Sequence, residues 1–441
     1  MAQPALAEFV LEAEYPDLPE HVVAQARRCL IDLLGVAAAG SATQLSRIIR
    51  NHAARHFADG GQAGARLLFD GRRVSPVGAA LANGMTIDAF DAHDGHPLTK
   101  GHVGCGVLPA LLAFCEAETI DDPREFLTSL VIGYEIGTRA GIALHATAPD
   151  YHTSGAWVAL ACAALGCRLM KLTQAQLHEA LGIAEYHGPR SQMMRCIDFP
   201  TMVKDGSGWG AMAGVSAAYL SADGFTGAPA LTATDPSTDG IWGDLGHRWR
   251  IMEQYFKPYP VCRWAQPAME AAMQLAHEAQ IAADDIASVE VFSFQEAVRL
   301  AAHTPETTEQ AQYSLPFPVA AALVHGRVGA AEISGEGLRH PVVLRLARSM
   351  RLTRDPDYDA RFPAQRWARI VATLTDGHKL ASDPAVARGS AENPLPDSEL
   401  ASKFHSYSAC ILDGEQSQKL FRLVTRLPDS GLVELFDELF D

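Results

Sequence analysis

The sequence lacks both a long apolar run and a recognisable disulfide framework. None of its 441 residues belongs to an apolar stretch of the eighteen or more residues that a membrane-spanning helix needs. The eight cysteines are scattered and form no C-x-x-C pair, a pattern typical of free thiols in a reducing compartment. The N-terminal "MAQPALAEFV" lacks the basic region, the apolar core and the cleavage site of a signal peptide. We therefore expect a cytoplasmic protein.

Positive charge is also scarce. Lysine and arginine number 36 against 52 aspartates and glutamates, which gives a formal net charge of −16. Nucleic-acid binding depends on neutralising phosphates with lysine and arginine, so this balance disfavours a nucleic-acid partner, and it disfavours an anionic membrane as well. A small anionic substrate is still compatible with the sequence if its cationic partners are gathered in one pocket.

The length of the chain predicts more than one domain, because a single hydrophobic core rarely grows this large. Segments such as "PEHVVAQARRCLIDLLGVAAAG" and "DDPREFLTSLVIGYEIGTRAG" carry apolar residues at helical spacing, the second behind an aspartate cap and an early proline. The segments "SGAWVALACAALGCRLMKL" and "WGAMAGVSAAYLSADGF" are rich in alanine and glycine, which allows helices to approach closely. We expect a helical domain over residues 1–265.

The pattern changes after residue 265. "ASVEVFSF" alternates in the manner of a strand, and "RWARIVATLTDGHKL" alternates and then reaches a hairpin-type Asp376-Gly377 turn. The intervening "SLPFPVAAALVHG" is helical in character. We expect a smaller α+β domain over residues 266–395, and helices over residues 396–441 that return to the first domain. The predicted fold class is mainly α with a smaller α+β domain.

The stretch "FDAHDGHPLTKGH", Phe90 to His102, concentrates ionisable side chains in a chain that is otherwise rich in alanine, leucine and glycine. A metal site at His93, Asp94 and His96 is one interpretation, but these residues lack the shared helical face of an H-E-x-x-H motif. A solvated loop without chemistry is another. The stretch leads into the apolar "VGCGVLPALLAFCEA", so it ends at the start of a buried helix. That context favours a proton-transfer pocket.

Three further segments carry cations or histidine, and each also has a simpler structural explanation. Lys204 precedes a Gly/Ser turn that enters a helix, where a cation and a helix N-terminus would both suit a carboxylate, although an exposed lysine on a turn is as good an interpretation. Lys257 and Arg263 flank two prolines in "YFKPYPVCRWAQPAM", which is also typical of a braced linker. His152 lies beside a Thr/Ser cap pair in "DYHTSGAW" and could serve as a capping or core histidine.

Together these segments resemble the MmgE/PrpD family, which contains 2-methylcitrate dehydratases, cis-aconitate decarboxylases and iminodisuccinate epimerases. The resemblance runs along most of the chain and includes "ARRCLIDLLGVAAAG", "ANGMTIDAFDAHD", "GHVGCGVLPALLAF", "VIGYEIGTRAG", "SADGFTGAP" and "FKPYPVCRWAQPAM". It implies a large helical domain with a smaller α+β domain, a homodimer, and no metal or organic cofactor.

The resemblance also suggests site residues. Asp91 and His102 match the aspartate and histidine that flank the family's active-site loop, Lys204 matches its pocket lysine, Lys257 matches the lysine at its domain junction, and His152 falls in the segment that supplies another histidine. This chain departs from the family pattern at three places. Gly95 stands where the decarboxylases carry a threonine, His102-Val103-Gly104 replaces H-P-G or H-P-S, and Cys262-Arg263 stands where decarboxylases place a histidine.

The chemistry shared by the family is proton transfer at a carbon beside a carboxylate, which needs cations directed at the developing negative charge. We expect His102, Asp91 and Lys204 to be catalytic, with His102 as general base or acid and Asp91 as its orienting or second proton-transfer partner. We expect the substrate, a small polycarboxylate, to be bound by Lys257, Arg263, His152, Lys100 and His93. Dehydration is the preferred outcome, followed by epimerisation and decarboxylation. The non-enzyme alternative, a helical scaffold or binding protein, predicts an exposed ionisable cluster.

Overall fold

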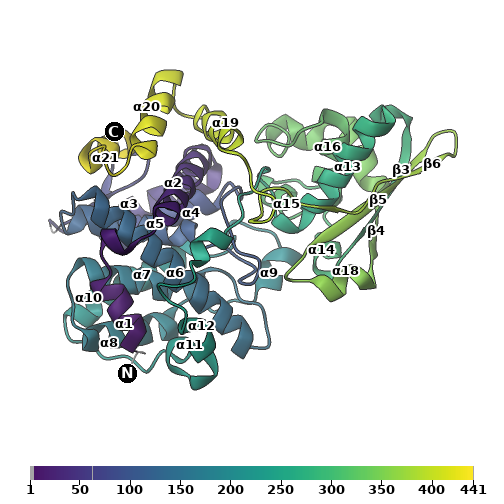
Figure 1. Ribbon diagram of the computed structural model, residues 1–441. Helices are drawn as coiled ribbons and strands as arrows, with labels where there is room; N and C mark the ends of the chain where they lie inside the picture. Colours follow the sequence, from purple (N-terminus) through teal and green to yellow (C-terminus); the bar gives the residue numbers. More distant parts are fainter. Residues whose placement is uncertain (1–3, 62, 441) are drawn as a thin grey trace. The chain divides into compact units, whose positions relative to one another are not determined.

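The computed structural model describes residues 4–61 and 63–440, which form two compact units (Figure 1). The larger unit contains the chain up to Met193, then Asp205–Tyr255, then the chain from Pro396 onward. The smaller unit contains Met194–Lys204 and Phe256–Leu395. Residues 194–204 and 256–265, which the sequence pattern assigned to the helical domain, thus belong to the smaller unit. Both segments lie at the borders between the units, where the sequence pattern indicates a change of composition but not which unit a residue joins.

The larger unit is a helical assembly. Helix α2 (Glu20–Ser41) and helix α6 (Pro123–Thr147) are the predicted amphipathic segments, and α6 begins at the predicted Asp122 cap, whose side chain accepts from the backbone N–H of Arg124. The remaining helices and short strands of this unit are α1 (Pro4–Glu12), η1 (Tyr15–Asp17), α3 (Gln44–His56), β1 (Ala65–Arg66), β2 (Arg73–Val74), α4 (Pro76–Asp88), α5 (Gly104–Ala117), α7 (Gly155–Leu169), α8 (Gln174–His187), α10 (Ser207–Ala222), α11 (Leu231–Thr234), η2 (Pro236–Thr238), α12 (Asp239–Trp242), η3 (Arg250–Glu253), α19 (Asp397–Ser408), α20 (Gly414–Thr425) and α21 (Leu432–Phe440).

Small residues bring the central helices of the larger unit close together. A Cβ atom added at Gly210 of α10 would lie 2.4 Å from the carbonyl oxygen of Gly155 in α7, and one added at Gly214 would lie 2.4 Å from the carbonyl oxygen of Ala159. Any larger side chain would force the two helices apart, because real Cβ atoms do not approach that closely. The glycines therefore allow the N-terminal ends of α7 and α10 to meet, which matters for the site described below.

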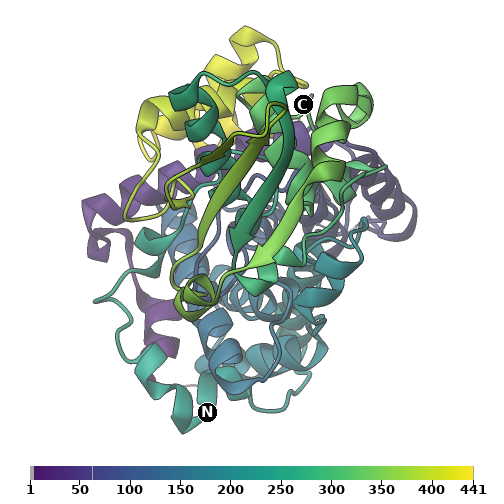
Figure 2. The ribbon, with the colours of Figure 1, turned by 90° about the vertical axis from the view of Figure 1, so that its right-hand side faces the viewer.

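The smaller unit is built on a mixed sheet with the order β4-β3-β5-β6, and Figure 2 shows its strands side by side. The predicted strands are β3 (Ile286–Ser293) and β5 (Trp367–Leu374), which pair antiparallel. β4 (Arg351–Arg354) pairs parallel with β3, and β6 (Lys379–Ala381) pairs with β5 across the predicted turn, where Gly377 has a φ of 91°. The other elements are β7 (Ala385–Val386), α9 (Met193–Asp198), η4 (Arg263–Ala265), α13 (Gln266–Ala279), η5 (Ala283–Asp285), α14 (Gln295–Val298), α15 (Thr308–Gln312), α16 (Pro316–His325), η6 (Gly335–Arg339), α17 (Pro341–Ser349) and α18 (Pro356–Arg361).

Helices α13 and α17 contact this sheet through β5 and β3. Along β3 and β5, buried and half-buried residues alternate, because one face of the sheet packs against the helices. The fold class predicted from sequence, mainly α with a smaller α+β part, is confirmed. Among the residues that the structure describes, no helix has the length and apolar character to cross a bilayer.

Candidate active site

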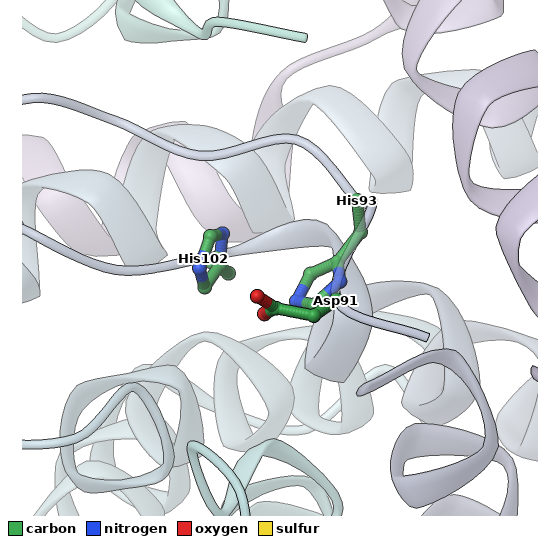
Figure 3. Close-up of side chains that lie close together, drawn as sticks. All are labelled: Asp91, His93 and His102. Atoms are coloured by element: carbon green, nitrogen blue, oxygen red, sulfur yellow. The ribbon is translucent and has the colours of Figure 1, made fainter. Parts of the chain in front are cut away.

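Three of the predicted site residues meet inside the loop between α4 and α5 (Figure 3). One ligand-type atom from each of Asp91, His93 and His102 lies within 4.8 Å of the other two, and the His93 and His102 rings are 4.3 Å apart between centroids. All three side chains are buried. The solvated loop and the exposed cluster expected of a scaffold are therefore both wrong for this stretch.

The hydrogen bonds of His102 define its tautomer. Its Nδ1 atom lies 2.5 Å from the backbone carbonyl oxygen of Asp94, which can only accept, so Nδ1 carries the proton and donates it. In the neutral ring the lone pair is then on Nε2. The backbone N–H of His102 donates to the hydroxyl of Ser154 at 2.9 Å. The first contact holds the ring in one orientation, and the second fixes the backbone that carries it.

The N-terminal ends of α5, α7 and α10 converge at this loop. Ser154 precedes the first residue of α7, and its hydroxyl donates to the carboxylate of Asp205, just before α10. The carboxylate of Asp88, at the end of α4, accepts from the backbone N–H groups of Asp205 and Ser207 at 3.2 and 3.4 Å. The sequence suggested that a substrate carboxylate would bind at the start of α10, just after Lys204. In the structure the carboxylate of Asp88 occupies this helix start instead.

A second layer of buried groups supports the loop from behind. The hydroxyl of Tyr134 in α6 donates to the carboxylate of Asp94. Burial, aided by the nearby charge of Asp32, raises the pKa of Asp94 to about 7, although Tyr134 and Lys403 act in the opposite direction. The Nζ atom of Lys403 in α19 pairs with Asp32 at 2.5 Å and donates to the carbonyl oxygen of Ala92 at 2.7 Å. Helices α2, α6 and α19 therefore all hold this loop.

Two residues of the alternative metal site have other partners. Asp94 accepts from Tyr134, and the Nε2 atom of His96 lies 2.9 Å from the carboxylate of Glu253. Burial works to raise the pKa of Glu253, but the His96 hydrogen bond and the charge of Arg250 outweigh it and lower the pKa to about 2. Within the part of the chain that the structure describes, metal-type spacing is found instead at Asp91, His93 and His102.

Lys100 and His152 contact two other aromatic side chains, Tyr151 and His145 respectively. The Nζ atom of Lys100 sits 4.2 Å from the centroid of the Tyr151 ring, and the backbone N–H of His152 donates to Nε2 of His145 at 3.0 Å. The rings of His145 and His152 stack with centroids 6.4 Å apart. Burial and the positive charge of Lys100 lower the pKa of His145 to about 3. This group belongs to the larger unit.

The remaining predicted cations belong to the smaller unit, and all three are buried. The Nζ atom of Lys204 donates to the side-chain oxygen of Gln312 at 2.5 Å and lies 4.5 Å from the centroid of the Tyr313 ring. The guanidinium of Arg263 donates to the Gln266 side chain at 2.9 Å and to the carbonyl oxygens of Ala387 and Arg388.

The same segment is linked to Gln312 through the backbone. The N–H group of Cys262 donates to the Gln312 carbonyl oxygen at 2.8 Å, so Gln312 contacts both Lys204 and the turn before Arg263. Lys257 is completely buried. Burying a charged ammonium is costly unless anionic or polar groups compensate for the lost water.

Three predicted site residues have a left-handed backbone. The φ angles of Asp91, Lys100 and Lys204 are 52°, 54° and 49°. This conformation is uncommon for residues other than glycine and costs roughly 1–3 kcal/mol where the surroundings enforce it. Such residues are concentrated at binding and catalytic sites, which supports assigning these positions to a site rather than to packing alone.

Sequence reasoning missed Tyr134, Ser154, Asp205 and Tyr255 as site residues. Tyr255 pairs with Gly95 through two backbone hydrogen bonds of 3.0 and 2.8 Å, and its ring lies edge-on to His102 with centroids 6.4 Å apart. A signal existed for three of them. Tyr134 lies inside "VIGYEIGTRAG" and Tyr255 opens "YFKPYPVCRWAQPAM", and Ser154 belongs to the Thr/Ser pair of "DYHTSGAW"; all three segments were noted, but these residues were given no role in the site.

Comparison with known proteins identifies the family of the chain. The MmgE/PrpD N-terminal domain matches residues 4–240 and the MmgE/PrpD C-terminal domain matches residues 259–428. The cis-aconitate decarboxylase-like protein oryM of Aspergillus oryzae is 24% identical over 97% of this chain and 94% of its own. The cis-aconitate decarboxylases of mouse and human are each 23% identical over 93% of this chain and 88% and 89% of theirs. The chain belongs to the MmgE/PrpD family.

Proposed function

We propose that this protein is an enzyme that removes a proton beside a carboxylate of a small polycarboxylate and then eliminates water, as a hydro-lyase similar to 2-methylcitrate dehydratase. The observation that carries the proposal is the state of His102. Its Nδ1–H is committed to the Asp94 carbonyl, so Nε2 can act as a general base, and the ring lies in a buried cluster with Asp91 and His93.

In the proposed reaction, Nε2 of His102 takes the proton from the carbon, and the electron pair moves into the adjacent carboxylate to give an enediolate. That electron pair then forms the carbon–carbon double bond as the hydroxyl group leaves. The leaving oxygen takes a proton from the second acid of the cluster, Asp91 or His93, so that water departs. A neutral imidazole and a carboxyl group are both suited to proton transfer near neutral pH.

The developing enediolate needs cationic partners. We assign the substrate carboxylates to Lys204 and Lys257, two buried cations that can form charge-assisted hydrogen bonds with them. Arg263 already donates to three protein acceptors, so we give it a supporting role. We assign Lys100 and His152 to a more distant carboxylate of the substrate.

The surroundings of Gly95 favour elimination over decarboxylation. A Cβ atom at this position would lie 2.5 Å from the Tyr255 hydroxyl oxygen and 2.7 Å from Nδ1 of His102. A threonine, expected here in a decarboxylase, would therefore displace either the tyrosine or the base. Decarboxylation of cis-aconitate is the second candidate, because the relatives with 23–24% identity bear that name.

Incubation in D₂O with 2-methylcitrate, citrate, cis-aconitate and iminodisuccinate tests the proposal. Elimination gives an unsaturated acid, together with deuterium in the reverse reaction. Epimerisation gives deuterium at a stereocentre, and decarboxylation releases CO₂. We expect elimination and no CO₂. Steady CO₂ release from cis-aconitate would establish the second candidate, and no exchange or elimination with any of these acids would contradict the enzyme assignment.

A further inference from the structure

The cluster that supplies the proposed base also has the composition of a metal site. Two imidazoles and one carboxylate, from His93, His102 and Asp91, converge from one loop (Figure 3). Their ligand atoms lie within 4.8 Å of one another and the side chains are buried. Two histidines with one carboxylate is a donor set used by zinc and by other divalent transition metals.

The spacing is close to what such an ion requires. Zinc bonds to nitrogen and oxygen at about 2.0–2.2 Å, which places neighbouring ligands of a tetrahedral site roughly 3.4 Å apart. The present limit of 4.8 Å between the ligand atoms is thus about 1.4 Å wider than in a formed tetrahedral site. The Nδ1–H of His102 already donates to a backbone carbonyl, as metal-bound histidines commonly do, and this tautomer leaves the Nε2 lone pair available to bond a metal ion.

The charge of the surroundings also favours a cation. The carboxylate of Asp88 lies 3.8 Å from Nε2 of His93, and the carboxylates of Asp94 and Asp205 are buried in the network around the same loop. Lys403, a buried cation that reaches the same loop through the carbonyl oxygen of Ala92, is paired with Asp32. Buried carboxylates gain from a divalent ion because water no longer screens their charge.

We propose that Asp91, His93 and His102 bind one divalent transition-metal ion, best Zn²⁺, and that the bound ion inhibits the enzyme by occupying the lone pair of His102. The proposal that a metal ion binds depends only on these three side chains and their spacing. Its inhibitory effect rests on the function proposed above. The ion would bond to one carboxylate oxygen and two imidazole nitrogens, and water or a substrate carboxylate would complete its coordination.

Binding is tested first, without reference to activity. Protein stripped with a chelator is titrated with Co²⁺, followed by its visible absorption, and with Zn²⁺ by calorimetry. We expect one ion per chain. His93→Ala should weaken binding by at least about tenfold. Asp91→Asn should do the same while keeping the left-handed backbone, which asparagine tolerates. His187→Ala, at an exposed histidine of α8, should bind as the parent does.

Circular dichroism of each variant separates lost ligands from lost folding. No binding by the parent, or equal binding by the folded Asp91→Asn and His93→Ala variants, would overturn the site. Turnover should fall in step with Zn²⁺ occupancy and return on adding chelator. Zn²⁺-stimulated turnover would overturn the inhibitory role. Metal binding that depends on Asp91 and His93, in a protein inactive on every polycarboxylate, would support the site and contradict the proposed function.

Discussion

The Nδ1 atom of His102 lies 2.5 Å from the backbone carbonyl oxygen of Asp94, and this hydrogen bond decides which nitrogen of the ring can accept a proton. The carboxylate of the same aspartate accepts from Tyr134. One residue therefore orients the base through its backbone and is itself held through its side chain.

His102→Asn should remove most turnover and leave the fold intact. A single general acid–base group typically contributes about 10²–10⁴-fold to the rate, and asparagine keeps a donor of similar position for the Asp94 carbonyl. Steady-state kinetics on the best substrate of the panel measures the loss. The exposed His187→Asn is the control and should turn over normally. Activity within about threefold of the parent would exclude His102 as the base.

Tyr134→Phe should lower kcat by about tenfold to a hundredfold, with little change in KM, because the loop that carries the base loses one of its fixed points. Tyr219→Phe is a matched control, since its hydroxyl donates to Glu118 at 2.9 Å in another part of the same unit. The two variants should lose similar thermal stability. A comparable drop in kcat for both would show that Tyr134 acts only on the stability of the fold.

Gly95→Ala should impair catalysis more than folding. The new methyl group would lie 2.5 Å from the Tyr255 hydroxyl oxygen and 2.7 Å from Nδ1 of His102, so one of these rings must move. Gly240→Ala, where a Cβ meets nothing within 4 Å, is the control. We expect kcat to fall by at least about tenfold for Gly95→Ala alone. Full activity of this variant would mean that His102 has freedom to shift.

Lys204→Ala should raise KM and lower kcat together, because a carboxylate-binding cation acts on the bound substrate and more strongly on the enediolate. Lys379→Ala, at an exposed lysine of β6, should change neither. Calorimetry with unreactive dicarboxylates and tricarboxylates gives an independent measure of binding. Unchanged affinity for these acids in Lys204→Ala would remove Lys204 from the carboxylate site.

His145 should make the protein sensitive to acid. Its pKa is lowered from 6.5 to about 3, so the folded state keeps the ring neutral while the unfolded state takes up a proton. The stability that this residue contributes is therefore fully present above pH 6.5 and lost as the pH falls towards 3.

His145→Gln, which can still accept from the His152 N–H, should remove this part of the pH dependence. The measurement is the difference in Tm between about pH 7.5 and about pH 5, which should be smaller in the variant than in the parent. Equal differences would mean that His145 is protonated in the folded protein at the lower pH.

The sequence predicted the regular elements well and the contacts of the site incompletely. Helix α6 and strands β3 and β5 lie where periodicity placed them, because caps, prolines and alternation act over neighbouring residues. The stretch from Phe90 to His102 was identified by its ionisable composition. The burial of its ionisable side chains was not, since burial depends on helices distant in the sequence that pack around them.

The supporting residues show the same limit. Tyr134 is 40 residues from Asp94, and Asp205 is 51 residues from Ser154. Local patterns do not encode such pairings, and a buried tyrosine at helical spacing has the same pattern as any core residue. The hydrogen bonds from the start of α10 to the Asp88 carboxylate could not be predicted either, because the sequence does not show that α4 ends beside that helix.

The contact of the Lys403 ammonium group affects when the loop that holds the base can be completed during synthesis. This group reaches from α19, near the end of the chain, to the carbonyl oxygen of Ala92 in the loop that holds the base. A ribosome must therefore synthesise more than 300 residues after Ala92 before this contact can form. The nascent chain can fold most helices of the larger unit earlier, but the loop acquires its last fixed point only near release.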